Sequence, residues 1–150
     1  MLRPSKKLAL ALEAVVDIAF QATLEPVQSQ DIGRRMDLPR RYLEQVMQQL
    51  VRAGILKGVR GPRGGYRLAR ERRRISIADI VAVVEKVEDE ENGSLASESE
   101  LGQKVMSPFW AKLEEEFMAK LSTITIEDLC QRAEKLDVAN GKAEGMDFSI

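Results

Sequence analysis

Three side chains with planar hydrogen-bonding groups, Arg41, Glu44 and Gln45, follow one another at helical spacing. Residues three and four positions apart share one face of an α-helix, so these three would point the same way. An Arg guanidinium pairs with guanine, a Gln amide pairs with adenine, and a Glu carboxylate accepts a hydrogen bond from the cytosine amino group. This face therefore has the chemistry needed to read DNA bases. A surface ion pair between Glu44 and Arg40 or Arg41 is the competing interpretation.

A run of arginine and glycine residues lies farther along the chain, between two short segments that favour β-strands. The segments are 55–59 and 66–68, and the run between them is Arg60-Gly61-Pro62-Arg63-Gly64-Gly65. Glycine and proline favour tight turns, so this stretch predicts a hairpin with a narrow, positively charged tip. Arg60 and Arg63 at such a tip can contact phosphates or enter a minor groove.

Two short helices are predicted immediately before this hairpin. The first covers about 29–36, and the second begins at Pro39, which suits the first position of a helix because its missing N–H costs nothing there. The second helix ends near Ala53, before Gly54. Its buried face is predicted from the apolar residues Leu43, Val46, Met47, Leu50 and Val51. Two helices and a basic hairpin in this order are typical of a winged helix-turn-helix, which lays its second helix in the major groove.

The rest of the chain is predicted to be helical, which makes the fold class mostly α with a small two-stranded β wing. A first helix is apolar on most sides, so we expect it to be buried on most sides. Two later helices begin with capping boxes, at Ser76 and Thr125. The predicted helices run from Ser5 to about Ala22, from Ser76 to Glu88, from Ser107 to Ser122 and from Thr125 to Leu136.

Charge is divided unevenly along the chain. Residues 1–75 hold 16 Lys and Arg against 7 Asp and Glu, whereas residues 76–150 hold 7 against 17, and the net charge is only −1. The basic half contains the predicted helix pair and hairpin. This asymmetry favours an anionic partner for the first half, and the base-reading face indicates that the partner is double-stranded DNA.

The composition excludes several other classes of protein. With Cys130 as its one cysteine and no histidine, the chain lacks the ingredients of a disulfide, a zinc site or a nucleophile paired with a base, so we expect no enzyme. The basic N-terminus precedes an apolar stretch, but Glu13 and Asp17 interrupt that stretch before it could form an export signal. We expect no membrane span and a cytoplasmic protein.

Two runs in the basic half resemble the signature of a known family. The run Arg41-Tyr42-Leu43-Glu44-Gln45 and residues 59–66, Val-Arg-Gly-Pro-Arg-Gly-Gly-Tyr, resemble the Rrf-two (Rrf2) family of winged-helix transcription regulators. The resemblance covers about residues 3–136. It implies a dimer whose long C-terminal helix, here about Pro108 to Ser122, crosses to the partner subunit.

The residue chemistry and the resemblance assign three sets of site residues. The base-reading set is Arg41, Glu44 and Gln45. The set expected to contact the DNA backbone or act in the wing is Lys6, Lys7, Arg34, Arg40, Gln48, Arg60, Arg63 and Arg67. The dimer-interface set is Phe109, Trp110, Leu113, Phe117 and Leu121. We expect a sequence-specific repressor that binds a pseudo-palindromic operator as a homodimer.

The chain departs from the iron–sulfur members of this family, which carry three cysteines before the long helix. Residues 85–107 contain no cysteine, so we expect no cofactor and no metal. A cluster held by Cys130 or by carboxylates is the alternative, although Cys130 favours a buried thiol. An effector, either a small molecule or a protein, stays open. So does a winged-helix module that docks on proteins without reading DNA.

Four regions are expected along the chain. Residues 1–75 form the winged helix-turn-helix, and residues 76–103 form a helix with an acidic, flexible connection over about 88–102. Residues 104–136 contain the dimerisation helix and the helix after it. Residues 137–150, with two glycines, give no reason to expect order.

Overall fold

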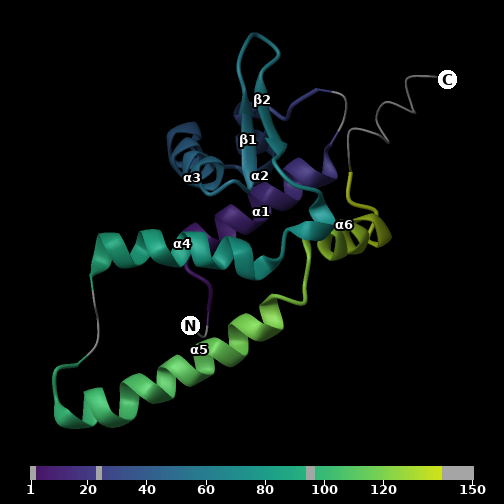
Figure 1. Ribbon diagram of the computed structural model, residues 1–150. Helices are drawn as coiled ribbons and strands as arrows, with labels where there is room; N and C mark the ends of the chain where they lie inside the picture. Colours follow the sequence, from purple (N-terminus) through teal and green to yellow (C-terminus); the bar gives the residue numbers. More distant parts are fainter. Residues whose placement is uncertain (1–2, 23–24, 94–96, 140–150) are drawn as a thin grey trace.

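Helix α1 (Lys6–Phe20) is the element around which the other helices and the hairpin are arranged (Figure 1). In this computed structural model, which describes residues 3–22, 25–93 and 97–139, α1 contacts α2, α3, α4, α6 and β2. The Ser5 side chain caps α1 by accepting a hydrogen bond from the Leu8 N–H, at 3.1 Å. Its buried residues are Leu8, Leu10, Ala11, Ala14, Val15, Ile18, Ala19 and Phe20. The prediction of a helix buried on most sides is confirmed.

The helix-turn-helix consists of α2 (Ser29–Met36) and α3 (Arg40–Arg52). Asp37 adopts a left-handed conformation with φ of 53°, which turns the chain between the two helices. Pro39 is the N-cap of α3 with extended backbone, one residue earlier than the predicted first helical position. The Arg35 side chain donates two hydrogen bonds to the carboxylate of Asp17, at 2.7 and 2.8 Å, and so attaches α2 to α1.

The wing is an antiparallel hairpin of β1 (Leu56–Val59) and β2 (Gly65–Leu68), which rises beside α3 in Figure 1. Its base is tied to the segment before α2, because the Val27 and Tyr66 backbones exchange two hydrogen bonds, at 2.9 and 2.7 Å. A Cβ on Gly65 would lie 2.4 Å from the Val27 carbonyl oxygen, so this strand position requires glycine. The positive φ of Gly61, 113°, serves the turn.

Helix α4 (Ile77–Asn92) is longer than the sequence predicted, and the acidic stretch 88–91 belongs to it. The physical reason is tertiary: the Ser5 hydroxyl donates to Glu88, and the Lys7 ammonium pairs with Glu91 at 2.8 Å. These contacts hold the acidic end of α4 against the start of α1. The expectation of a flexible connection from residue 88 is therefore wrong for 88–92, and residues 94–96 lie outside the described part of the chain.

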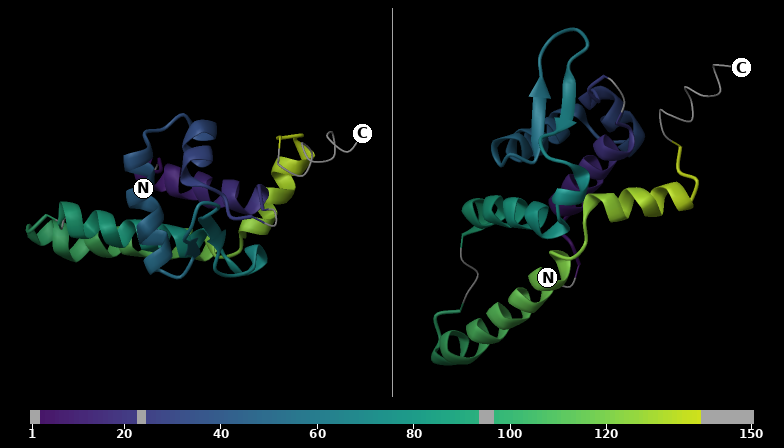
Figure 2. Two further views of the ribbon diagram at one scale, coloured as in Figure 1. Left: turned by 90° about the horizontal axis from the view of Figure 1, so that it is seen from above. Right: turned by 45° about the vertical axis from the view of Figure 1, so that its right-hand side comes forward.

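The long helix also begins earlier than Ser107. A π-helical turn, η2 (Gly102–Met106), leads without a break into α5 (Ser107–Leu121). Pro108 has no N–H and its ring would crowd the carbonyl four residues earlier in a regular α-helix, so a wider turn before it relieves the clash. The Ser107 N–H accordingly bonds to the Gly102 carbonyl. Both views of Figure 2 show α5 alongside α4, away from the wing.

Helix α6 (Ile126–Lys135) returns to the winged-helix body and packs on α1. Its predicted capping box is present, with Thr125 and Asp128 exchanging hydrogen bonds. Arg72, in the 3₁₀ turn η1 (Arg72–Arg74), forms an ion pair with Glu127 of α6. Ile126 and Cys130 are buried in the same core as α1, α3 and α4. Among the described helices, none is long and apolar enough to cross a membrane.

The chain beyond α6 is only partly described. Asp137 and Val138 continue from α6 with backbone N–H donors bonded to the carbonyls of Glu134 and Ala133, both at 3.1 Å. These residues are ordered by local hydrogen bonds, contrary to the expectation for the tail. Residues 140–150, the rest of the expected disordered tail, lie outside the described residues.

Candidate nucleic-acid interface

A cleft of about 420 Å³ lies between the starts of α2 and α3 and the wing. The start of α2 contributes Gln28, Ser29 and Gln30, α3 contributes Arg40, and the wing contributes residues 58–66 apart from Arg63. The glycines of the wing leave its backbone uncovered on this side. The structure thus brings the predicted helix start and the basic hairpin to one place. Sequence reasoning missed Gln28, Ser29 and Gln30, which lie before and at the start of a helix without an apolar pattern of their own.

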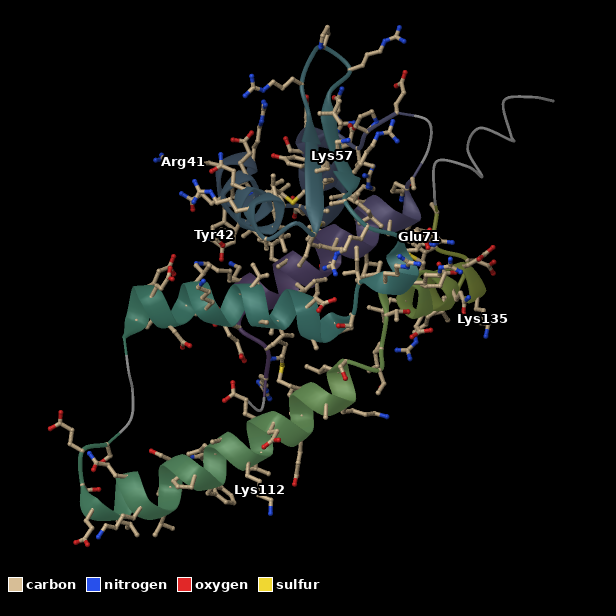
Figure 3. The ribbon with its side chains drawn as sticks, viewed as in Figure 1. Arg41, Tyr42, Lys57, Glu71, Lys112 and Lys135 are labelled. Atoms are coloured by element: carbon tan, nitrogen blue, oxygen red, sulfur yellow. The ribbon has the colours of Figure 1, made fainter. Side chains whose placement is uncertain are left out.

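The side chains predicted to read bases occupy the outer face of α3. Arg41, Gln45 and Gln48 are exposed, and Leu43, Val46 and Met47 on the other face are buried. Figure 3 shows Arg41 on the outside of the helix and Tyr42 on the side that faces α4. Tyr42 packs against the core, as the sequence indicated. No contact limits Arg41 or Gln45 among the described residues, so both are available to a ligand.

Glu44 differs from its two neighbours because it already has a partner. Arg40 Nε donates a hydrogen bond to Glu44 Oε1 at 2.9 Å, the surface ion pair that the sequence left as the competing interpretation. Tyr66 of β2 lies near this pair. Partial burial raises the pKa of Tyr66, and the negative charge of Glu44 raises it further, while Arg40 lowers it. The phenol is therefore protonated at neutral pH and joins the wing to the start of α3.

The wing carries cations with different degrees of freedom. Arg60 is exposed and forms no ion pair with any residue that the structure describes, whereas Arg63 lies 3.5 Å from Glu25 and is 86% exposed. Lys57, which the sequence analysis did not select, is exposed and lies directly opposite Arg67 across the hairpin (Figure 3). Like charges that face each other across strands repel, so an anionic ligand would stabilise this arrangement.

Other predicted backbone contacts lie apart from the cleft. Lys7 is held by Glu91 of α4, and Lys6 is exposed on the same first turn of α1. Arg34 lies 3.8 Å from Asp31 and lines a hollow along the α2–α3 turn together with Arg40. The structure therefore groups Arg40 and Arg60 around one cleft but places Lys6 and Lys7 near the end of α4.

Helix α5 exposes large apolar side chains to solvent. Phe109, Trp110, Leu113 and Phe117 are 43–51% exposed, and no residue of α5 is buried. The rings of Phe109 and Trp110 meet edge to face, with centroids 5.2 Å apart. Leu121, the fifth residue assigned to the dimer interface, is half-buried against the core instead. An apolar stripe of this size on one helix is typical of a surface that another protein covers.

A pair of carboxylates lies between α4 and α5, where Glu85 and Glu114 line a hollow of about 510 Å³. Partial burial raises the pKa of Glu85, and its hydrogen bond with Glu114 and the negative charges of Glu114, Asp89 and Glu88 raise it further. The folded state therefore holds this proton to a higher pH than the unfolded chain does. The contribution to stability is present at low pH and is lost as pH rises through the raised pKa.

Glu85→Gln should therefore increase the free energy of unfolding at neutral pH, by less than about 1 kcal/mol because solvent screens this partly exposed pair. The gain should vanish as pH falls below about 4, where the wild-type carboxyl is protonated in both states. Urea unfolding at several pH values measures it. Glu115→Gln, an exposed change on α5, is the control. A gain that did not depend on pH, or one shared by the control, would contradict the assignment.

A helix-turn-helix with an exposed polar face on its second helix, beside a cationic hairpin, defines the class of winged helix-turn-helix DNA-binding proteins. Within that class, the Rrf2 family, described as an iron-dependent transcriptional regulator, matches residues 4–132. The chain belongs to the Rrf2 family of transcription regulators. It is a regulator and not an enzyme.

Individual relatives agree with this membership. The transcriptional regulator IscR of Xenorhabdus nematophila is 31% identical over 93% of this chain and 85% of its own length. The solved structure of T. potens IscR superposes with a TM-score of 0.71 at 33% identity, and covers 95% of this chain and 96% of that one. The global cysteine regulator CymR of B. subtilis has a TM-score of 0.67 at 26% identity, with 88% and 98% covered. The predicted fold and family are confirmed.

The family description implies iron, but the described residues do not fit an iron site. They contain no group of three His, Cys, Asp or Glu side chains placed to hold a metal ion. Cys130 is 2% exposed in the core, and burial raises the pKa of its thiol, which disfavours the thiolate that binds metals. The residues that the structure describes thus offer one inaccessible sulfur and no partner ligands for it.

Proposed function

We propose that this protein is a sequence-specific transcription regulator that binds a pseudo-palindromic operator as a homodimer and represses the adjacent gene. The observation that carries the proposal is the cleft in which Arg40, Arg60 and the bare wing backbone meet beside the exposed face of α3. A duplex whose major groove receives α3 would bring its sugar–phosphate backbone to this cleft. A DNA partner places the protein in the cytoplasm.

In the proposed complex, Arg41, Glu44 and Gln45 contact base edges. Arg41 and Gln45 suit guanine and adenine, and both are exposed before DNA arrives. Glu44 must exchange its 2.9 Å contact with Arg40 for a cytosine amino group, which releases Arg40 toward a phosphate. Gln48 and Arg67 lie behind these residues as backbone contacts. Arg60 enters the minor groove, which attracts arginine where it is narrow.

The homodimer is proposed from the exposed stripe on α5. Two copies related by a two-fold axis would cover Phe109, Trp110, Leu113 and Phe117 of each other. The same axis would set the two α3 helices on successive major grooves, about 34–36 Å apart. Repression follows most simply, since a dimer that occupies a promoter blocks polymerase without any further contact.

A protein-docking module is the second candidate function, and the Arg40–Glu44 ion pair is the observation that favours it. If that pair persists, α3 presents a balanced surface instead of a base-reading one. A gel-shift at low salt discriminates the two functions, because a regulator must retain duplex DNA and a docking module need not.

The salt dependence of DNA binding tests the wing. Replacing both Arg60 and Arg63 with alanine should weaken binding and reduce the slope of log K against log salt by about two units, one for each lost phosphate contact. Gel-shift titrations over a range of salt concentrations measure the slope. Arg73→Ala is the matched control, because Arg73 is exposed on η1 and pairs with Glu71 at 2.7 Å. A slope unchanged in the double variant would remove these arginines from the contacts.

We also propose that the regulator works without a conventional iron–sulfur cluster. Protein purified without oxygen should be colourless and iron-free, and should still bind DNA, because the described residues offer one buried thiol as a sulfur ligand. Absorption spectra and metal analysis measure this directly. Visible absorbance with bound iron would contradict it, and loss of that iron in Cys130→Ala would assign an unconventional site.

A further inference from the structure

A second hollow, the back cavity, lies at the base of the wing, with a volume of about 580 Å³. Its walls come from the last turn of α1, the segment that leads into α2, strand β2 and residues 69–72. Ile18 and Ala19 of the main core form its floor, together with Val27 and the half-buried Leu68. Its volume falls in the range of about 300–1,000 Å³ that is usual for small-molecule sites.

The charges around the back cavity favour an anion. Arg67, Arg70 and Arg72 line it, opposed by Glu25 and Glu71. The two carboxylates each have an arginine outside the cavity within ion-pair distance: Arg63 lies 3.5 Å from Glu25, and Arg73 lies 2.7 Å from Glu71.

Arg70 is the arginine best placed to exchange its partner. Its nearest contact, with Asp79, is 3.7 Å long, which is beyond hydrogen-bonding distance. Arg72, in contrast, is held by Glu127. A carboxylate could therefore pair with the Arg70 guanidinium through two parallel hydrogen bonds at little cost.

The back cavity shares a wall with the candidate DNA interface. Tyr66 lines both the back cavity and the cleft between α2, α3 and the wing. Its backbone bonds to Val27, two residues before α2 begins, and its phenol feels the charges of Glu44 and Arg40 on α3. A molecule lodged beside Val27 and Tyr66 would thus touch the strand and the segment that position both DNA-contacting elements.

We propose that the back cavity is an effector site for a small organic carboxylate with an apolar body. The carboxylate pairs with Arg70, and the apolar body covers Ile18, Val27 and Leu68. Occupancy shifts the Val27–Tyr66 bridge and with it the angle between the wing and α3. The effector role, but not the binding itself, rests on the proposed function.

The test is a titration of full-length, ¹⁵N-labelled protein with 4-phenylbutyrate, without DNA, followed by amide NMR. A ligand of this size is expected to bind in the millimolar range. Saturable shifts should appear at the amides of Val27, Tyr66 and Leu68. Arg70→Gln should weaken binding about tenfold, because a charge-assisted hydrogen bond is lost. Ala22→Leu should also weaken it by filling the cavity, and Arg73→Gln should leave it unchanged.

Three outcomes would overturn the proposal. They are the absence of saturable shifts, equal shifts with the uncharged analogue 4-phenylbutanol, and an equal loss of binding in Arg73→Gln and Arg70→Gln. Because the titration contains no DNA, its failure leaves the proposed DNA-binding function untouched. Conversely, a failed gel-shift would overturn that function and leave the carboxylate site standing.

Discussion

Replacing both Phe109 and Phe117 with aspartate should convert the protein to a monomer and weaken operator binding by about a hundredfold or more, because linked binding of two half-sites is lost. Both rings are about half exposed on α5 and bury nothing within the subunit. The substitutions therefore place four charges in the proposed dimer interface without opening the core. Sedimentation equilibrium reports the mass, and gel-shifts with a two-half-site duplex report the affinity.

Leu136→Asp provides the control for this pair, because Leu136 is 71% exposed at the end of α6, away from the α5 stripe. It should leave both the dimer and the affinity intact. A double variant that stays dimeric, or a wild-type protein that is monomeric at the concentrations where it binds operator, would contradict the proposed interface. Circular dichroism of the double variant distinguishes dissociation from unfolding.

Removing base contacts from α3 should have the second-largest effect. Arg41→Ala should cost about 1–3 kcal/mol in each half-site, because a bidentate contact to guanine is lost twice in a dimer. Glu44→Ala should act differently: it removes an acceptor from base readout and also frees Arg40, its 2.9 Å partner. We therefore expect relaxed preference at one operator position with a smaller loss of affinity. Binding-site selection with each variant measures the change.

The control for these substitutions is Arg52→Ala, an exposed arginine in the last turn of the same helix. It removes the same charge from α3 at a position that the proposed groove contact does not reach. If Glu44→Ala selected the same sequences as the wild type, Glu44 would be a surface ion-pair residue only. If Arg52→Ala lost as much affinity as Arg41→Ala, the effect of Arg41 would be one of net charge.

Elements that depend on local signals were predictable from the sequence. The predicted bounds of α2 match the observed ones, and the capping boxes at Ser76 and Thr125 begin α4 and α6 as expected. The wing was predicted from glycines whose roles are local, such as the turn at Gly61. The apolar face of α3 was predicted because its spacing records burial directly.

Features that depend on distant residues were not predictable. The acidic end of α4 is helical because Lys7, more than eighty residues earlier, pairs with Glu91. The bridge between Val27 and Tyr66 likewise joins segments that carry no shared pattern. Lys57 was missed because its strand position becomes meaningful only once the register places it opposite Arg67. The partner of Glu44 was left open by the sequence because Arg40 and Arg41 both lie within helical reach, and the structure selects Arg40.

Membership of a family described as iron-dependent does not by itself assign an iron site to this chain. The DNA-facing features, namely the exposed α3 face and the cationic wing, are carried by residues that are present. The sensing feature of the iron–sulfur relatives requires cysteines that residues 85–107 do not contain. The two functions therefore separate in this protein, and a different signal must act on the same DNA-binding body.

The central claim is sequence-specific DNA binding by a two-fold dimer, and binding-site selection with the full-length wild-type protein tests it most directly. Random duplexes retained at moderate salt would be sequenced over several rounds. We predict enrichment of an inverted repeat whose half-sites are centred about 10–10.5 base pairs apart, or a multiple of that spacing. Retention without any enriched sequence, or enrichment of a single half-site, would contradict the account.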